Sequence, residues 1–239
     1  MQRDELLRKA YMGEAIPGFI HNIGNPIGAM LGFVTIIRDE ADKLKEEVAA
    51  LPDDDVKKRF AEISANMDEF LGLTAQSERS LRDILDRFTQ KWNKDNADEI
   101  GEIHLTELVA IETDIMATNR FFKHKIKKNI EYADYVPSVW GIWRSASQPV
   151  SSLLMQYTTA LENVKSPALA VKVSETDGKP TILITANAHL ANNTEDSLDE
   201  PVLTLKECIE TLRPIATLQY SEPDENSSVV MIEFAGEGK

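Results

Sequence analysis

Phe19-Ile20-His21-Asn22-Ile23-Gly24-Asn25-Pro26-Ile27 places a histidine, an amide side chain and a proline at fixed spacing in an apolar segment. It lies in a longer segment whose apolar residues recur at alternating steps of three and four, a pattern typical of a helix buried along one seam. The seam residues are Ile16, Ile20, Ile23, Ile27, Met30, Val34, Ile37, Ala41, Leu44, Val48 and Leu51. His21 stands one residue away from this seam, so we expect its imidazole on the flank of a helical bundle, within reach of another protein.

A second segment repeats the same apolar pattern. Its seam residues are Val56, Phe60, Ile63, Met67, Phe70, Thr74, Ser77, Leu81, Ile84 and Phe88. Between the two segments, residues 51–55 contain a proline, which ends one helix, and three aspartates, which favour the positive N-terminus of the next. The sequence therefore predicts an antiparallel helical hairpin. Two helices leave half of each apolar stripe in water, so we expect a homodimer in which two hairpins form a four-helix bundle.

Composition excludes several classes of partner. The formal net charge is -14, which argues against nucleic acid, because binding to a phosphate backbone depends mainly on Lys and Arg. No apolar run approaches membrane-spanning length, and the first residues lack the apolar core of a signal peptide. The single cysteine, Cys208, cannot form an internal disulfide. We therefore expect a cytoplasmic protein with neither a membrane nor a nucleic-acid partner.

The chain is expected to divide into a helical hairpin at residues 1–93, a polar linker at 94–101 and a second domain at 102–239. The second domain mixes both kinds of element. Helices are expected at 103–118, 145–164 and 203–212, and strands at 126–132, 169–174, 180–186, 217–220 and 228–234, the last two as a closing hairpin. The predicted fold class is α+β, with an antiparallel helical hairpin followed by an α/β sandwich whose helices cover one face of the sheet.

The box around His21 resembles that of the bacterial two-component histidine kinases. Their dimerisation and phosphotransfer hairpin carries His-(Glu/Asp)-x-x-(Asn/Thr)-Pro-(Leu/Ile), which His21, Asn25, Pro26 and Ile27 match, while Asn22 replaces the usual acid. The resemblance implies that His21 accepts a phosphoryl group and that response-regulator receiver domains are the partners. It also implies that Asn22 stands where an acid assists autophosphorylation, and that Asn25 stands where family members with phosphatase activity orient a water.

The second domain resembles the ATP-binding domain of the same family, a Bergerat-type sandwich, but its nucleotide motifs are absent. Residues 148–157 lack the two asparagines that hold magnesium in the family, and residues 185–189 lack its Asp-x-Gly-x-Gly. Residues 200–205 lack the glycine-rich phosphate loop, without which backbone amides cannot readily wrap a triphosphate. The resemblance therefore implies a degenerate ATPase-like domain with no cofactor, and any Mg²⁺ is expected on the partner receiver domain.

Three glycines follow the histidine at helical spacing. Gly24, Gly28 and Gly32 lie four residues apart on one face, although each glycine in a helix costs about 0.5 to 1 kcal/mol relative to alanine. We expect this strip, together with Leu31, to contact a helix of the receiver domain. Close packing of helices within the dimer is the alternative explanation.

These observations favour a histidine phosphotransferase that relays phosphoryl groups between receiver domains without ATP. A relay that takes its phosphoryl group from an aspartyl phosphate needs only a neutral, accessible and correctly directed imidazole. One alternative is a non-catalytic pseudokinase or phosphatase-type regulator that binds a receiver or a partner kinase. A second alternative is an active histidine kinase with divergent nucleotide contacts.

Overall fold

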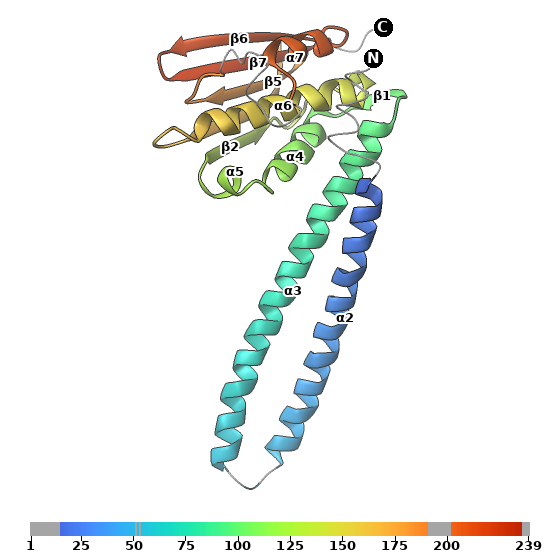
Figure 1. Cartoon of the computed structure of the whole chain (residues 1–239), viewed down its shortest axis with the longest axis vertical. Coiled ribbons are helices and arrows are strands. Elements are labelled where there is room, and N and C mark those ends of the chain that lie inside the picture. Colours follow the sequence, from blue (N-terminus) through green and yellow to red (C-terminus); the bar gives the residue numbers. More distant parts are fainter. Residues whose placement is uncertain (1–14, 51, 53, 191–201, 236–239) are drawn as a thin grey trace. The chain divides into compact units, whose positions relative to one another are not determined.

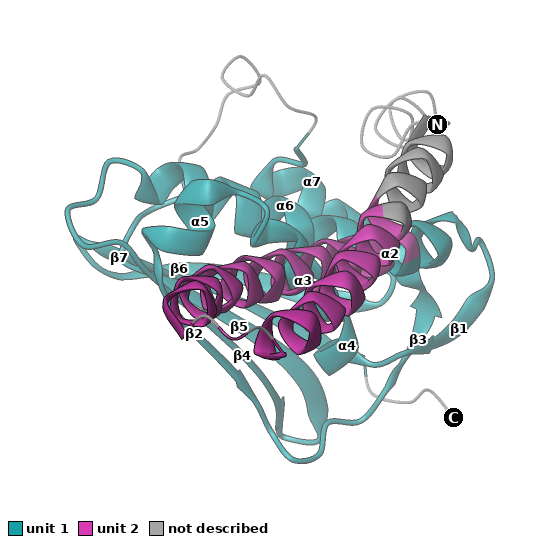
Figure 2. Cartoon of the chain, turned by 90° about the horizontal axis from the view of Figure 1, so that it is seen from below, with its two compact units in different colours: residues 1–11, 90–239 teal, residues 12–89 magenta. Residues whose placement is uncertain are grey.

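A computed structural model of the chain describes residues 15–50, 52, 54–190 and 202–235, without the side chains of residues 15–26 and of Ala29. The chain forms two compact units (Figure 2). One comprises residues 12–89, here called the hairpin unit, and the other includes residues 90–239, here called the C-terminal unit. None of the helices in the described ranges combines the length and the apolar character that crossing a membrane requires.

The hairpin unit confirms the two predicted long helices. Helix α2 (Ala15–Ala49) and helix α3 (Asp54–Asn96) run antiparallel (Figure 1). Two aspartates, Asp54 and Asp55, occupy the first turn of α3, where the unpaired N–H groups of a helix favour negative charge. An ion pair of 2.8 Å between Lys45 Nζ and Asp68 Oδ2 links the two helices.

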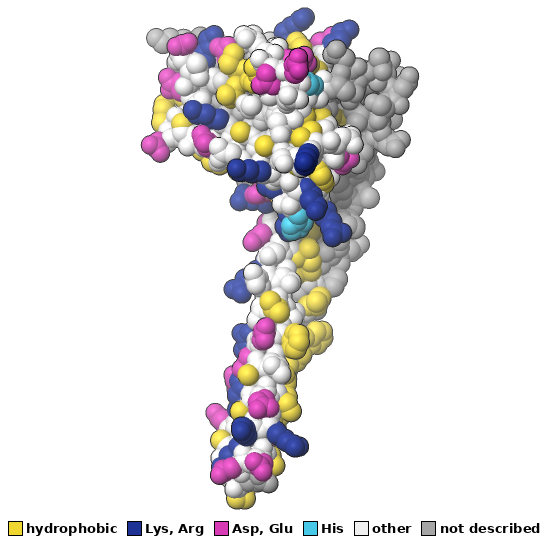
Figure 3. Space-filling model, turned by 90° about the vertical axis from the view of Figure 1, so that its left-hand side faces the viewer, with side chains coloured by type: hydrophobic (Ala, Val, Ile, Leu, Met, Phe, Trp, Pro, Cys, Tyr) yellow, Lys and Arg dark blue, Asp and Glu magenta, His cyan; other side chains and the backbone are white. Residues whose placement is uncertain are grey.

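Much of the apolar surface of the hairpin unit faces solvent. Among its described apolar side chains, only Ile27, Ala41 and Leu71 are buried. Others are between 38% and 69% exposed, namely Met30, Phe33, Ile36, Ile37, Leu44, Val56, Ile63, Met67, Phe70, Leu73 and Leu81. Figure 3 shows hydrophobic side chains in a line along the helices. One copy of the hairpin therefore leaves a long apolar stripe uncovered, as the two seams predict.

The C-terminal unit contains a five-stranded sheet in the order β2-β4-β5-β7-β6. Strands β2 and β4 are parallel, and the other neighbours are antiparallel. The strands are β2 (Lys127–Tyr132), β4 (Ala168–Thr176), β5 (Lys179–Ala186), β6 (Ala216–Asp224) and β7 (Ser227–Phe234). A two-residue turn joins β4 to β5, and its residues Asp177 and Gly178 both have positive φ, 51° and 77°, as a tight hairpin requires.

Helices α4 (Leu105–Met116), α6 (Trp143–Leu161) and α7 (Leu205–Leu212) form a layer over the sheet (Figure 1). One core joins the helices and the sheet, because alternate residues of β7 point inward and meet the buried faces of α4 and α6. The α+β fold class is confirmed, with a helical hairpin followed by a mixed sheet and its helices. The predicted closing hairpin is also confirmed as β6 and β7.

Three short elements were not predicted from the sequence. They are β1 (Ile100–Ile103), β3 (Val139–Ile142), which pairs with β1, and the single-turn helix α5 (Arg120–His124). The predicted linker at 94–101 is also wrong in part, because α3 continues to Asn96 and β1 begins at Ile100. The polar residues at the end of α3 have partners inside the C-terminal unit. The lack of an apolar period there therefore reflects buried polar contacts rather than a flexible linker.

Candidate functional site

Helix α2 carries the box that the sequence singles out. With 100° per residue, Gly24, Asn25, Gly28, Leu31 and Gly32 all fall within about 80° of His21 around the helix axis. One face of α2 therefore holds the candidate phosphoacceptor, the amide and the glycine strip. Asn22 lies about 100° away from His21, at the edge of this face. The side chains of residues 21–26 lie outside the described part, so the predicted exposure of His21 stays a prediction.

The described part of the glycine strip faces open space. Gly28 and Gly32 are exposed, and a Cβ atom added to either would meet no neighbouring heavy atom within 4 Å. Leu31 beside them is half-buried. Packing within the single hairpin therefore does not require glycine at these two positions. The strip remains a smooth surface, available either to a partner's helix or to a second hairpin.

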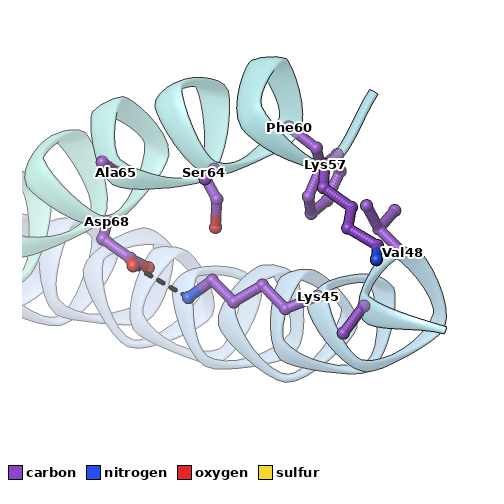
Figure 4. A pocket seen from close by; sticks show the side chains of 9 residues that line it. Lys45, Val48, Lys57, Phe60, Ser64, Ala65 and Asp68 are labelled. Carbon is purple, nitrogen blue, oxygen red and sulfur yellow. Dashed lines mark hydrogen bonds and ion pairs between the residues drawn. The ribbon is translucent and has the colours of Figure 1, made fainter. Parts of the chain in front are cut away.

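A groove opens at the other end of the hairpin unit, near the turn (Figure 4). It has a volume of about 450 Å³, and small side chains such as Ala49, Ala61 and Ala65 form much of its wall. The hydroxyl of Ser64 is buried in it and has no hydrogen-bond partner among the described residues. Lys45 is 24 positions after His21, or about 36 Å along the helix, so the groove is separate from the histidine box.

In the C-terminal unit, helix α6 stands where the resemblance places the magnesium ligands. Two of its polar side chains instead bind the backbone of Leu203. Gln156 Nε2 donates to the Leu203 carbonyl at 2.7 Å, and the Leu203 N–H donates to Ser152 Oγ at 3.1 Å. Ser152, Gln156 and Leu203 are all buried. Their hydrogen-bonding groups are therefore engaged in joining α6 to the segment before α7.

The segment after β5 is tied into the unit in the same way. Asn187 Oδ1 accepts from the N–H of Ala168 at 2.7 Å, and Asn187 Nδ2 donates to the carbonyl of Ser166 at 2.8 Å. Ser228 Oγ donates to the carbonyl of Ala188 at 2.6 Å. The Asn187 side chain and the Ala188 carbonyl, in the segment that lacks the Asp-x-Gly-x-Gly of the resemblance, thus bind other groups of this chain.

Two buried groups beside these contacts are protonated at neutral pH. The Tyr157 hydroxyl lies 3.1 Å from Ser228 Oγ, and burial raises the pKa of Tyr157 to about 12. Burial also raises the pKa of Cys208 to about 12. A thiol that stays protonated is a poor nucleophile, which agrees with a packing role for Cys208. In the part of the chain that the structure describes, no three His, Cys, Asp or Glu side chains gather as a metal site would require.

A buried charged cluster, which the sequence analysis missed, fixes the end of α3 within the C-terminal unit. Lys91 Nζ binds Glu112 Oε1 of α4, lies 2.6 Å from Ser147 Oγ of α6 and lies 3.1 Å from Asp95 Oδ2. Ser147 Oγ lies 2.9 Å from Asp95 Oδ1 and 2.6 Å from Glu112 Oε1. The four side chains are at most 10% exposed. The signal in the sequence was a charged residue, Glu112, in the apolar run of a predicted helix.

The charges of this cluster do not balance when every group is ionised, because one ammonium faces two carboxylates. Burial, opposed by Lys91 and reinforced by Asp95, raises the pKa of Glu112. Burial alone would lower the pKa of Lys91, but the carboxylates of Glu112 and Asp95 raise it. Glu112 Oε2 has no hydrogen-bond partner among the described residues. The two carboxyl groups therefore favour the charged form of Lys91, whereas burial disfavours the charged form of Glu112.

Solved histidine kinases resemble this chain. Histidine kinase AdeS of Acinetobacter baumannii has a TM-score of 0.46 and 14% identity, over 86% of this chain and 96% of that one. The catalytic domain of histidine kinase ThkA has a TM-score of 0.46 and 16% identity, over 58% and 97% of the two chains. ThkA in complex with the response regulator TrrA has a TM-score of 0.43 and 15% identity, over 98% and 64%.

No protein-family model and no curated protein matches the chain. All three TM-scores are below 0.5, so the similarities establish neither a family nor a function.

Proposed function

We propose that this protein is a histidine phosphotransferase that accepts a phosphoryl group on His21 from the aspartyl phosphate of one receiver domain and passes it to another. A lone pair of the neutral imidazole attacks phosphorus, the N–P bond forms, and the acyl phosphate P–O bond breaks to release a carboxylate on the donor. An aspartate carboxylate of the second receiver domain then attacks phosphorus, the N–P bond breaks, and the neutral imidazole is regenerated. The receiver supplies Mg²⁺ and the groups that stabilise the transferred phosphoryl.

The pair of hydrogen bonds between α6 and Leu203 carries the proposal that ATP takes no part. A histidine kinase must hold magnesium and a triphosphate with polar side chains and free backbone amides. Here Ser152 and Gln156 are buried and bound to the chain's own backbone, and the buried Leu203 lies in the segment that the resemblance aligns with the glycine-rich loop. Displacing them for a nucleotide would leave backbone groups of Leu203 without partners, which costs about 1 to 3 kcal/mol each.

We also propose that two hairpins associate through their exposed apolar stripes. Burial of a Phe or Leu side chain is worth about 1.5 to 3 kcal/mol, so a stripe of this length favours association strongly. A second hairpin would cover the stripe and complete a four-helix bundle, leaving His21 on its flank.

The decisive experiment transfers radiolabelled phosphate. Each receiver domain of the source organism is phosphorylated with ³²P-acetyl phosphate, freed of donor and mixed with the wild-type chain or with His21→Ala. Label should appear on the wild-type chain within minutes and be absent from the variant. Label that stays on every receiver would contradict the proposal.

Incubation with γ-³²P-ATP and Mg²⁺ separates the relay from an active kinase. No label should appear on the wild-type protein or on His21→Ala. Millimolar MgATP should also leave the melting temperature unchanged, because a ligand that binds the folded state would raise it. Labelling of His21 by ATP would favour an active kinase with divergent nucleotide contacts.

A phosphatase-type regulator is the second candidate, because Asn25 lies one helical turn after His21 on the same face. In this case the receiver domain would lose its ³²P label as inorganic phosphate, and no label would appear on this protein. His21→Ala would then retain activity that Asn25→Ala loses. Binding of a receiver without any loss of its label would instead indicate a pseudokinase.

A further inference from the structure

A dense cationic segment lies on the C-terminal unit of this acidic protein. Residues 120–128 contain five of the 26 Lys and Arg residues, one His and no acidic residue. Its basic residues are Arg120, Lys123, His124, Lys125, Lys127 and Lys128. They come from α5, its C-terminal cap and the start of β2. All except Lys128 are exposed.

One of these lysines has a structural task. Lys128 Nζ donates to the carbonyls of Phe122 and Lys123 at 2.5 and 2.8 Å, and its ammonium lies 5.1 Å from the centre of the Phe122 ring. It therefore satisfies the last carbonyls of α5. The remaining four cations have no such role, and none of them forms an ion pair with another described residue.

The chain positions a further cation beside this group. The N–H of Lys127 donates to the carbonyl of Pro167 at 2.8 Å, and Lys127 pairs with Ala168 at the start of β4. Lys165, two residues before Pro167, is exposed and likewise unpaired within the described ranges. Arg120, Lys123, Lys125, Lys127 and Lys165 are here called the basic patch. Figure 3 shows Lys and Arg side chains gathered around a histidine on this face of the unit.

Protection of a sheet edge explains only part of the basic patch. Strand β2 is at the end of the strand order, and lysines on an edge strand prevent other strands from pairing with it. This accounts for Lys127. It does not account for Arg120, Lys123 and Lys125, which lie on α5 and its cap, outside the strand.

We propose that the basic patch docks an acidic face of a partner protein. Five exposed cations favour an anionic ligand, and since none of them forms an ion pair with a residue that the structure describes, they can form ion pairs with a partner. An extended polyanion such as nucleic acid or a lipid surface would also meet the rest of a chain whose net charge is -14. A compact partner would meet only the patch, because charges beyond about 8 Å are largely screened at physiological ionic strength.

The test measures binding of a fluorescein-labelled dodecapeptide of alternating Glu and Asp to the full chain by anisotropy, at 50 and 200 mM NaCl. The wild-type chain should bind, and more weakly at the higher salt. The variant K123E/K125E/K127E should bind about tenfold more weakly, since it loses three exposed ion pairs that are each weak. Lys128 is left intact because it stabilises α5.

A matched variant, K179E/K206E/R213E, reverses three exposed charges elsewhere in the same unit and should keep near wild-type affinity. Melting curves of both variants, and of K123Q/K125Q/K127Q, check that folding is retained. Equal losses in the two Glu variants, or no binding by the wild type, would overturn the proposal.

Two further probes distinguish other anions. A twelve-nucleotide single-stranded DNA and vesicles containing 30% phosphatidylglycerol are measured under the same conditions. Tighter, patch-dependent binding of either than of the peptide would also overturn the proposal and assign the patch to that polyanion. The readout is binding rather than phosphorylation, so it is independent of the role of His21.

Discussion

The two units of this protein differ in how far their apolar side chains are buried and in whether their buried polar side chains have hydrogen-bond partners. The hairpin unit exposes residues as large as Phe70, which is 69% exposed, and leaves the buried Ser64 hydroxyl without a described partner. The C-terminal unit buries its apolar residues in one core and binds most of its buried polar side chains internally, as at Gln156 and Ser228. The hairpin unit therefore leaves uncovered the apolar surface that the proposed second copy would bury, whereas the C-terminal unit buries its own apolar surface in one core.

The largest expected effect would come from the exposed stripe. Replacing Phe70 with Ala should weaken dimerisation by about 3 to 6 kcal/mol, because both copies lose an aromatic side chain from the interface. Sedimentation equilibrium of the full chain measures the change. Glu69→Ala, at an exposed polar neighbour, should leave the dimer intact. A wild-type chain that sediments as a monomer would refute the dimer and weaken the contrast between the units.

The second-largest effect is expected from a substitution in the buried charged cluster of the C-terminal unit. Lys91→Met should lower the free energy of unfolding by about 3 to 5 kcal/mol, because two buried carboxylates lose their cation. Urea unfolding followed by tryptophan fluorescence measures it. Lys94→Met provides the control. Its ammonium pairs with Glu107 and lies over the Trp143 ring, but both charged side chains are about one third exposed, so a loss of about 1 kcal/mol is expected.

A smaller effect is expected at the contact between α6 and Leu203. Gln156→Ala removes the donor to a buried carbonyl and should cost about 1 to 3 kcal/mol of unfolding free energy. Thr159→Ala, an exposed position on the same helix, should change it by no more than about 0.5 kcal/mol. If the two variants were equally stable, the proposal that this contact closes the position where the resemblance places a nucleotide would lose its support.

The smallest expected effect is stabilising. Gly28→Ala and Gly32→Ala should each raise the stability of the hairpin by about 0.5 to 1 kcal/mol, since a methyl group there meets open space and alanine favours a helix. Thermal unfolding measures this gain, and Gly72→Ala on α3 should give a similar one. Phosphoryl transfer should slow only in the α2 variants, if the strip contacts the receiver. Unchanged transfer rates would remove the strip from the docking surface.

The long helices and most strands could be predicted because their apolar periods are local properties of the chain. The short elements could not, because β1 has only four residues and its pairing partner, β3, begins more than thirty residues later. The sequence predicts a linker near the end of α3 because Lys91 and Asp95 interrupt the apolar period. Their partners, Glu112 and Ser147, come from distant positions that only folding brings close.

Local sequence patterns are sufficient to predict the helical hairpin, the α+β order of elements, and the helix face shared by a histidine, an amide and three glycines. Helical periodicity fixes these features without reference to any distant residue. The contacts of Ser152 and Gln156 with Leu203, and the position of Lys91 between Glu112 and Asp95, arise only on folding. The same holds for the five cations near the start of β2, which form no ion pair with a described residue. Such contacts join residues far apart in the chain, and their energies depend on burial and on partners that no local pattern specifies.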